Sequence, residues 1–459
     1  MLAHGKAFAA GGWRPRSGRA PQRRDVHSPA VIHPGRFRYC RTAAGRAEKE
    51  LYCEAVPLGT LAARHGTPLY VYSATAIRER LGAFDAAFRG IPHTLCYSVK
   101  ANSSLAVLRL IARAGQGFDV VSGGELERVL RAAPRAAGKT VFSGVGKSRE
   151  EMALALRRGI RLFNVESASE LSTLGEVCAR LGRVAPISIR VNPDLPANTH
   201  PYISTGLHRH KFGVPIPEAE QLYREAARNP QLRVRGVSVH IGSQISDLRP
   251  FRAAMERVAA LVRRLRGAGL EISCVDAGGG LAIPYSGARN DFRARFAAYA
   301  RAVVHPLRGL GVHLVLEPGR AIVGPAGALL TRVLYRKTNH GKRFLIVDAA
   351  MNDLLRPALY GAQHEVVPVS LASGASGSER TDVVGPICES GDFLARGIEL
   401  PAIPEGALLA ILEAGAYAAS LGSNYNSRGK PPEVLVEGKS ARLVRRRQST
   451  ADQMRLESF

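Results

Sequence analysis

The sequence predicts an α/β protein, a (β/α)8 TIM barrel followed by a smaller, mainly antiparallel β-domain. From Leu69 to about Arg320, short β-rich runs alternate with helical stretches, which is typical of βα units around a parallel sheet. After Arg320 the β-rich runs alternate with Gly/Pro turns and little helix. The chain of 459 residues also exceeds one ordinary core, which favours two domains.

The barrel prediction depends on eight candidate strands. Their ends fall near Lys100, Ser122, Gly146, Glu166, Asn192, Gly242, Gly278 and Glu317. Eight repeats within about 250 residues match the usual size of such a barrel.

Helices are expected in the gaps between these strands. Residues 148–151 and 167–170 each place a serine three residues before a glutamate, which is the pattern of a capping box. Another helix shows one apolar face at 3.6-residue spacing. That face consists of Phe251, Met255, Val258, Val262 and Leu265.

The domain boundaries follow from these patterns. We expect an N-terminal extension over 1–36, the barrel over 73–330 and the β-domain over 331–459. Segment 37–72, which ends in the strand-like run 69–72, is expected to pair with the β-domain. Strands of that domain are expected at 344–347, 383–384, 408–412 and 434–436.

Composition narrows the class of protein. Hydrophobic residues make up 46% and charged residues 22%, as in a globular enzyme. No apolar stretch reaches the length needed to span a bilayer. The six cysteines form no C-x-x-C pair, which argues against a zinc site or a disulfide framework. We therefore expect no metal and a cytoplasmic location.

The net charge of +26 raises the question of nucleic-acid binding. The arginines are scattered along helical stretches, so a solvated surface is the favoured interpretation and nucleic acid is an unlikely partner. Residues 1–50 hold eleven Lys/Arg against three Asp/Glu, a net of 11 − 3 = +8. No apolar segment follows, which disfavours a secretory signal. A disordered tail, an organelle transit peptide, an upstream start codon and a nucleic-acid-binding arm remain open for the extension.

Unusual residues stand at the predicted strand ends, where barrels of this type carry their catalytic groups. Lys100 follows an apolar strand; alone it would be a surface lysine, but in a barrel mouth partial desolvation favours a Schiff-base nucleophile. Residues 276–280 hold three consecutive glycines, whose exposed amides and small size allow close approach of a phosphate. Residues 317–320 add a carboxylate, a glycine and an arginine.

Seven stretches in order resemble the fold-type III pyridoxal-phosphate-dependent decarboxylases, whose barrel is alanine-racemase-like. The resemblance runs from about Phe37 to the C-terminus. The stretches are 97–102 (YSVKAN), 118–126 (FDVVSGGEL), 190–193 (RVNP), 240–244 (HIGSQ), 276–280 (DAGGG), 317–320 (EPGR) and 388–392 (CESGD).

The resemblance implies pyridoxal 5'-phosphate as cofactor, held covalently by Lys100, with His240 stacked on its ring and Glu317 at the ring nitrogen. A carboxylate there keeps the nitrogen protonated and favours decarboxylation. A satisfied core histidine is the alternative for His240. The remaining cofactor-binding residues implied are Asp119, Ser243, Gly279, Gly280, Gly319, Arg320 and Tyr417.

The same resemblance implies the substrate and the assembly. Residues 355–360 (LRPALY) and 388–389 are similar to the branch that removes CO2 from meso-2,6-diaminopimelate, giving L-lysine in the last step of lysine biosynthesis. A homodimer with shared active sites is implied, in which Cys388 donates a proton across the interface; an ordinary buried thiol is the alternative. The implied substrate-binding residues are Arg320, Arg356, Tyr360, Glu389 and Tyr417.

Other functions stay open at this point. A decarboxylase of the same fold for ornithine, arginine or carboxynorspermidine is the nearest, and a catalytically silent pyridoxal-phosphate-binding protein is the next. An intact set of Lys100, His240, Glu317 and Cys388 argues against the silent protein. Residues 200–206 and 211–214 also resemble the diaminopimelate branch and are expected to form a mobile lid.

Overall fold

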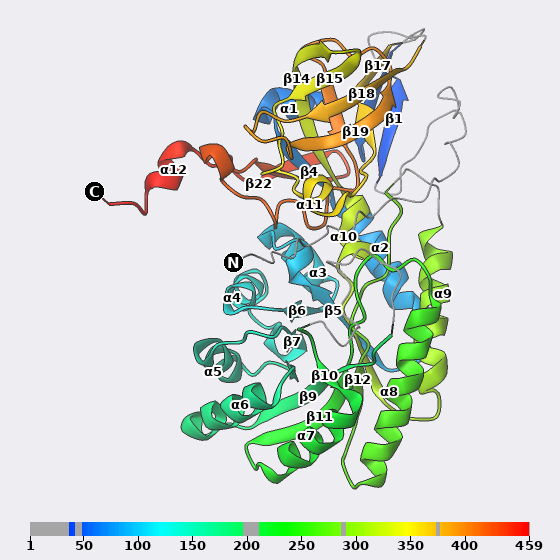
Figure 1. Ribbon diagram of the computed structural model, residues 1–459, viewed down its shortest axis with the longest axis vertical. Helices are drawn as coiled ribbons and strands as arrows, with labels where there is room; N and C mark the ends of the chain where they lie inside the picture. The colour runs from blue at the N-terminus through cyan, green and yellow to red at the C-terminus, as the bar shows by residue number, and fades with distance from the viewer. Residues whose placement is uncertain (1–35, 42–47, 196–210, 286–290, 373–376, 459) are drawn as a thin grey trace, which may run out of the picture.

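The computed structural model describes residues 36–41, 48–195, 211–285, 291–372 and 377–458. The extension up to residue 35 and the expected lid segment 200–206 lie outside the described residues. Figure 1 shows two parts, a barrel ringed by helices below and a β-domain above. The C-terminal helix α12 (Thr450–Met454) projects to one side.

Eight parallel strands close into a barrel, which confirms the predicted fold class. Closure comes from the pairing of β8 with β9 and of β13 with β5. The predicted strand ends fall at or shortly after the observed ones. The barrel strands are β5 (His93–Ser98), β6 (Gly117–Val120), β7 (Thr140–Phe142), β8 (Leu162–Val165), β9 (Ala185–Asn192), β11 (Leu232–Ser238), β12 (Cys274–Asp276) and β13 (His313–Leu316). A short strand, β10 (Val214–Pro215), extends the sheet beside β9.

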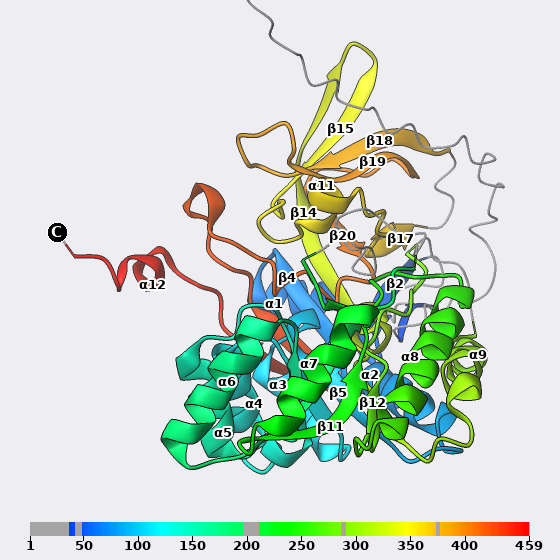
Figure 2. The ribbon, with the colours of Figure 1, turned by 60° about the horizontal axis from the view of Figure 1, so that its bottom comes forward.

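The helices form an outer ring around these strands (Figure 2). They are α2 (Ala74–Ala87), α3 (Leu105–Arg113), α4 (Gly123–Ala132), α5 (Arg149–Arg158), α6 (Ala168–Leu181), α7 (Ile216–Arg228), α8 (Arg249–Gly267) and α9 (Phe292–Val304). Only the four-residue α10 (Arg320–Val323) follows β13. Helix α2, which precedes the first barrel strand, packs against α9 and completes the ring.

The two predicted capping boxes have different outcomes. In α5 the box is present, with Ser148 Oγ accepting from the Glu151 amide and Glu151 Oε2 accepting from the Ser148 amide. In α6 Ser167 does cap the helix, but the Glu170 carboxylate accepts instead from Lys147 Nζ at 2.7 Å and from the Glu166 amide. A buried ammonium without an anionic partner costs more free energy than a helix end without a second cap, so Glu170 pairs with Lys147.

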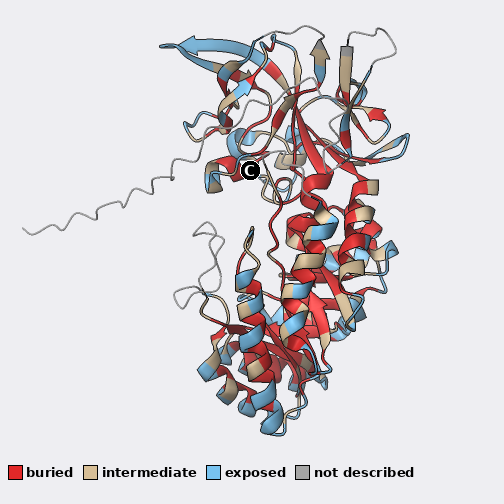
Figure 3. Ribbon diagram, turned by 90° about the vertical axis from the view of Figure 1, so that its right-hand side faces the viewer, coloured by how far each residue is buried: buried red, intermediate tan, exposed pale blue. Residues whose placement is uncertain are grey.

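The predicted apolar face of α8 is confirmed, because all five of its predicted residues are buried against the barrel. Figure 3 shows the general rule, with buried strands inside and exposed outer helix faces. Burying such a face supplies most of a helix's stability in a barrel, since isolated helices of this length are marginal in water.

The β-domain is mainly antiparallel, as predicted, with two parallel pairings, β15 with β18 and β21 with β4. Its strand order is β19-β18-β15-β14-β4-β21-β22, with β20 and β16 alongside β14. The strands are β4 (Leu69–Ser73), β14 (Gly327–Asn339), β15 (Lys342–Val347), β16 (Val366–Pro368), β18 (Glu379–Val384), β19 (Phe393–Leu400), β20 (Leu408–Ile411), β21 (Glu433–Glu437) and β22 (Ser440–Arg445).

The first strands before the barrel form a separate four-stranded sheet with one strand of the β-domain, whereas β4 joins the large sheet. Strand β1 (Phe37–Arg41) pairs with β2 (Glu48–Cys53), which also pairs with β3 (Val56–Pro57) and β17 (Ser370–Ala372). Helix α1 (Leu58–His65) follows, and then β4 pairs with β14 from Leu69↔Leu330 to Tyr72↔Gly327. The strand that enters the barrel and the strand that leaves it therefore lie side by side.

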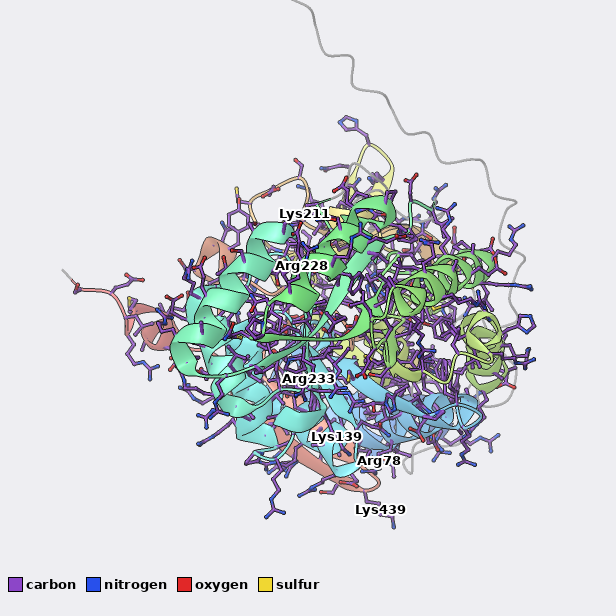
Figure 4. All side chains as sticks on the ribbon, turned by 90° about the horizontal axis from the view of Figure 1, so that it is seen from below. Arg78, Lys139, Lys211, Arg228, Arg233 and Lys439 are labelled. Atoms are coloured by element: carbon purple, nitrogen blue, oxygen red, sulfur yellow. The ribbon has the colours of Figure 1, made fainter. Side chains whose placement is uncertain are left out.

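Basic side chains are spread around the molecule. The exposed residues labelled in Figure 4 come from helices, strands and loops of both domains: Arg78, Lys139, Lys211, Arg228, Arg233 and Lys439. This distribution agrees with a solvated basic surface. Among the described helices, none combines the length and the apolar character that crossing a membrane requires.

The capping box of α5 gives a stability prediction. Ser148→Ala removes the side-chain acceptor of the first turn and should lower the free energy of unfolding by about 1 kcal/mol, measured by urea denaturation. Ser172→Ala, at an exposed position within α6, is the matched control and should change it by less than about 0.5 kcal/mol. Equal effects of the two substitutions would contradict the capping role.

Candidate active site

A cavity of about 190 Å³ opens where the C-terminal ends of the barrel strands meet the β-domain. Its lining contains most of the residues that the sequence singled out. These are Lys100, His240, Ser243, Gly279, Gly280, Glu317, Gly319, Arg320, Tyr360 and Tyr417. Eight of these residues follow barrel strands and converge because parallel strands bring their carboxyl ends to the same side, while Tyr360 and Tyr417 come from the β-domain.

Lys100 lies directly after β5 and points at a carboxylate. Its Nζ donates to Asp119 Oδ2 at 2.6 Å, and Ser98 Oγ donates to the same oxygen. Burial alone lowers the pKa of Lys100, but the negative charges of Asp119 and Glu317 outweigh burial and raise it above its ordinary value. This corrects the expectation that desolvation would lower the pKa. The other oxygen of Asp119 is buried without a hydrogen-bond partner.

Glu317 stands at the end of β13 among other acids. Burial, with the repulsion of Asp119 and Asp276, raises the pKa of Glu317 well above its ordinary value. Ser143 Oγ donates to Glu317 Oε1 at 3.1 Å, while Asn164 Nδ2 donates to Asp276 Oδ2 at 2.8 Å. Burial and the neighbouring carboxyl groups thus make a charged Glu317 unfavourable unless a cation lies beside it.

His240 is neutral and has a defined tautomer. Burial, followed by the positive charges of Arg190 and Lys100, lowers its pKa well below the ordinary value. Its Nδ1 accepts from the Gly279 amide at 3.2 Å, so the ring proton belongs on Nε2. A neutral ring that lines the pocket suits stacking against a flat ligand.

The glycine run has a packing role besides lining the pocket. The amides of Gly278 and Gly279 are already satisfied, by Asp276 Oδ1 and His240 Nδ1. The absence of side chains is required by packing, since a Cβ at Gly279 would lie 2.2 Å from the Glu317 carbonyl oxygen and one at Gly280 would lie 2.1 Å from the Gly242 carbonyl oxygen. These glycines let the loops after β11, β12 and β13 pack against each other under the pocket.

Arg320 marks the cationic end of the pocket. Its Nη2 donates to Ser243 Oγ at 3.0 Å, and its guanidinium lies 4.7 Å from the ring centre of Tyr417. It also donates to the hydroxyl of Tyr285. The Nε atom is buried and has no hydrogen-bond partner. A buried guanidinium with an unused donor is suited to an anionic ligand.

A second guanidinium, that of Arg356 in α11 (Arg356–Tyr360), also packs against Tyr285. Its carbon atom Cζ is 4.4 Å from the ring centre of Tyr285, and its Nη1 is 2.7 Å from His364 Nε2. Burial lowers the pKa of Arg356 to about 10, so it remains charged at neutral pH. Among the described residues, neither Arg356 nor Arg320 has an acidic partner within ion-pair distance.

Tyr417 comes from the β-domain and is fixed against the barrel. Its amide donates to the carbonyl oxygen of Ala101 at 2.8 Å, and Asn102 Nδ2 donates to the Gly415 carbonyl oxygen at 3.1 Å. Tyr417 adopts a positive φ of 56°, which a bulky side chain seldom adopts. This conformation turns its ring toward Arg320.

Two predicted residues lie elsewhere. Cys388 and Glu389 are exposed on the loop between β18 and β19 and do not line the pocket. Within one chain the structure therefore does not bring them to Lys100. Lys211–Val214, the described part of the expected lid, leads into β10 beside β9.

Sequence reasoning missed four polar residues. Ser143 and Asn164 hold the acids inside the barrel; a polar residue at a buried strand position was the available signal for Asn164. Tyr285 and His364 surround Arg356, and no spacing in the sequence connects them to it.

Comparison with known proteins identifies the family of this chain. Residues 74–324 match the family described as "Pyridoxal-dependent decarboxylase, pyridoxal binding domain". The diaminopimelate decarboxylase of Pseudomonas fluorescens is 53% identical over 404 residues, covering 88% of this chain and 95% of that protein. The enzyme of the same name from Pseudomonas aeruginosa is 52% identical over 405 residues, covering 88% and 96%.

A solved structure shows the same fold. The crystal structure of diaminopimelate decarboxylase from Helicobacter pylori complexed with L-lysine has a TM-score of 0.83 and 41% sequence identity, covering 87% of this chain and 99% of that one. With matches of this extent and identity, the chain belongs to the diaminopimelate decarboxylase family of pyridoxal-dependent decarboxylases.

Proposed function

We propose that this protein is a carboxy-lyase that decarboxylates meso-2,6-diaminopimelate to L-lysine and CO2 with pyridoxal 5'-phosphate, the last step of lysine biosynthesis. The observation that carries the proposal is one pocket lined by Lys100, Glu317 and Arg320. A second arginine without an acidic partner among the described residues, Arg356, contacts Tyr285, as Arg320 also does. The relatives named diaminopimelate decarboxylase support this substrate.

The residues present fit the cofactor. Lys100 supplies the amine for a covalent link, and His240 offers a neutral ring for stacking. Arg320 and Ser243, together with the glycines at 279, 280 and 319, would surround the phosphate. The unpartnered Nε of Arg320 and the unpartnered Oδ1 of Asp119 are buried donor and acceptor positions that a phosphorylated pyridine can satisfy.

Bound pyridoxal 5'-phosphate supplies an electron sink for the pair released when the carbon–CO2 bond breaks. Glu317, a carboxyl group in the pocket wall, would face the ring nitrogen and keep it protonated, which deepens the electron sink. Ser143 and Asn164 hold the acids in place through hydrogen bonds. Asp119 keeps Lys100 oriented and charged until its proton is removed.

The far end of the substrate decides its identity. Diaminopimelate carries a carboxylate and an ammonium there, whereas diamine precursors such as ornithine carry only the ammonium. Arg356 is buried and cationic, and Tyr360 lies in the pocket wall on the same short helix. A buried guanidinium repels an ammonium and pairs with a carboxylate, so this pocket favours diaminopimelate over ornithine.

The exposed loop that carries Cys388 and Glu389 would complete the site in a homodimer. We infer that Cys388 of one subunit protonates the carbon that has lost CO2 in the other, while Glu389 meets the distal ammonium. Both residues are exposed in a single chain and are therefore accessible to a second subunit, which supports this assignment.

The competing functions make different predictions. A decarboxylase for ornithine, arginine or carboxynorspermidine would act on those substrates in preference to diaminopimelate. A silent protein would bind the cofactor without releasing CO2.

All six cysteines are free thiols, which supports our placement of the enzyme in the reducing cytoplasm.

The first prediction for this function concerns Lys100. The wild type with pyridoxal 5'-phosphate should release L-lysine and CO2 from meso-diaminopimelate, and Lys100→Ala should lose at least about 1,000-fold in kcat because the covalent link is gone. Lysine chromatography and CO2 trapping measure both products. Cofactor absorbance without lysine release would redirect the search to other amino acids, and no cofactor absorbance would overturn the proposal.

A mixing experiment tests the shared site. Lys100→Ala and Cys388→Ala should each be nearly inactive alone. After equal amounts exchange subunits, half the dimers are mixed and each has one intact site, so activity should return to about a quarter of the wild type. Activity that never exceeds the sum of the two variants would place the cysteine in its own subunit or outside the reaction.

Glu317→Gln tests the proton at the ring nitrogen. The amide keeps the size of Glu317 but cannot carry the negative charge that keeps the ring nitrogen protonated, so kcat should fall at least about 100-fold while the cofactor stays bound. Steady-state CO2 release and the cofactor absorbance measure the two effects. Loss of the cofactor at unchanged kcat per bound cofactor would assign Glu317 to binding alone.

A further inference from the structure

His364 is a buried histidine with both ring nitrogens engaged. Its Nδ1 lies 2.8 Å from the carbonyl oxygen of Leu412, and its Nε2 lies 2.7 Å from Arg356 Nη1. A guanidinium can only donate and a carbonyl oxygen can only accept. The ring therefore carries its proton on Nδ1 and accepts from Arg356 at Nε2.

The ring is also uncharged. Burial, followed by the positive charge of Arg356, lowers the pKa of His364 to about 3. Only 4% of its surface is exposed, and its ring packs edge-on against Tyr285 with centres 4.9 Å apart. At neutral pH His364 thus gives Arg356 an acceptor without giving it a counter-charge.

This contact determines which edge of Arg356 remains available. His364 occupies Nη1, while Nε is buried without a hydrogen-bond partner. Nε and Nη2 form the edge through which a guanidinium binds a carboxylate with two parallel hydrogen bonds. Tyr285 covers one face of the same guanidinium at 4.4 Å, so that its plane is fixed as well.

A carboxylate in the place of His364 would act differently. It would form a buried ion pair with Arg356 and compete with any incoming anion for the same charge. A neutral acceptor avoids that competition. The positive charge of Arg356 remains available, reinforced by Arg320, whose guanidinium lies 5.9 Å from the ring centre of the same Tyr285.

We propose that His364 is a positioning residue for substrate recognition, which orients Arg356 toward the distal carboxylate without neutralising it. The inference rests on the proposed function, because it takes the carboxylate of diaminopimelate, which L-lysine retains, as the ligand of Arg356. It adds a specificity-determining contact outside the pocket lining.

The experiment measures binding, so that it does not depend on turnover. Two probes are titrated into the cofactor-loaded enzyme and followed by cofactor absorbance: L-lysine, which has the carboxylate, and cadaverine, which is the same chain without it. The variants are His364→Ala, His364→Phe, His364→Gln and His364→Asp. The control is His313→Gln, a partly buried histidine at the start of β13, at the opposite end of the barrel.

His364→Ala and His364→Phe should weaken L-lysine binding about tenfold, because Arg356 loses its acceptor, and should leave cadaverine within about twofold. His364→Gln, whose amide oxygen can accept from Arg356, should recover most of the affinity. His364→Asp should weaken L-lysine at least as much as alanine does, although it restores an acceptor. His313→Gln should match the wild type for both probes.

Three outcomes would overturn the inference: unchanged L-lysine affinity in the alanine and phenylalanine variants, equal losses for L-lysine and cadaverine, or wild-type L-lysine affinity in His364→Asp. Thermal unfolding and cofactor absorbance identify variants that fail to fold. If alanine leaves too large a cavity, phenylalanine fills it and carries the same comparison. A wild type that binds L-lysine normally but releases none from diaminopimelate would overturn the proposed function and leave this test in place.

Discussion

The pairing of β4 with β14 determines where everything else in this protein can lie. Strand β4 enters the barrel and β14 leaves it, and four consecutive residue pairs hold them together in antiparallel register. The β-domain therefore sits over the barrel mouth, where the loop of Tyr417 can bond to Ala101 next to Lys100. A Cβ at Gly415 in that loop would lie 1.9 Å from the Val323 carbonyl oxygen, so the two domains meet without space for a side chain.

This arrangement separates opposite charges across one pocket. The barrel contributes carboxyl groups, of which Asp119 and Glu317 face Lys100, while the domain boundary contributes Arg320 and Arg356. Each group of like charges is costly when buried, and the cost is reflected in the raised pKa of Glu317 and the lowered pKa of Arg356. A ligand with a cationic ring at one end and anionic groups at the other relieves both. The unfavourable burial of these charges thus contributes both to ligand binding and to the chemistry of the site.

The barrel and most of its pocket could be predicted from the sequence because strand ends are local features. Lys100, His240 and Glu317 each follow an apolar run, and parallel topology then brings them together. The surroundings of Arg356 could not be predicted, because they depend on contacts between distant segments. His364, in the loop after α11, contacts Arg356 and is held in place by the carbonyl oxygen of Leu412, just after β20. The rise in the pKa of Lys100 could not be predicted for the same reason, because it depends on Asp119 on the neighbouring strand β6.

The loop that carries Cys388 is ordered in the single chain although it is exposed. Asp392, which is buried, accepts from the amides of Met351 and Ile387, and Asn426 accepts from the amide of Cys388. A loop held by so many backbone bonds loses little conformational entropy when it docks, so the free energy of association is not spent on ordering it. This rigidity supports the proposal that the exposed thiol of Cys388 completes a site in a second subunit. If the proposed role of Cys388 holds, catalysis depends on assembly, because Cys388 does not line the pocket of Lys100 in its own chain.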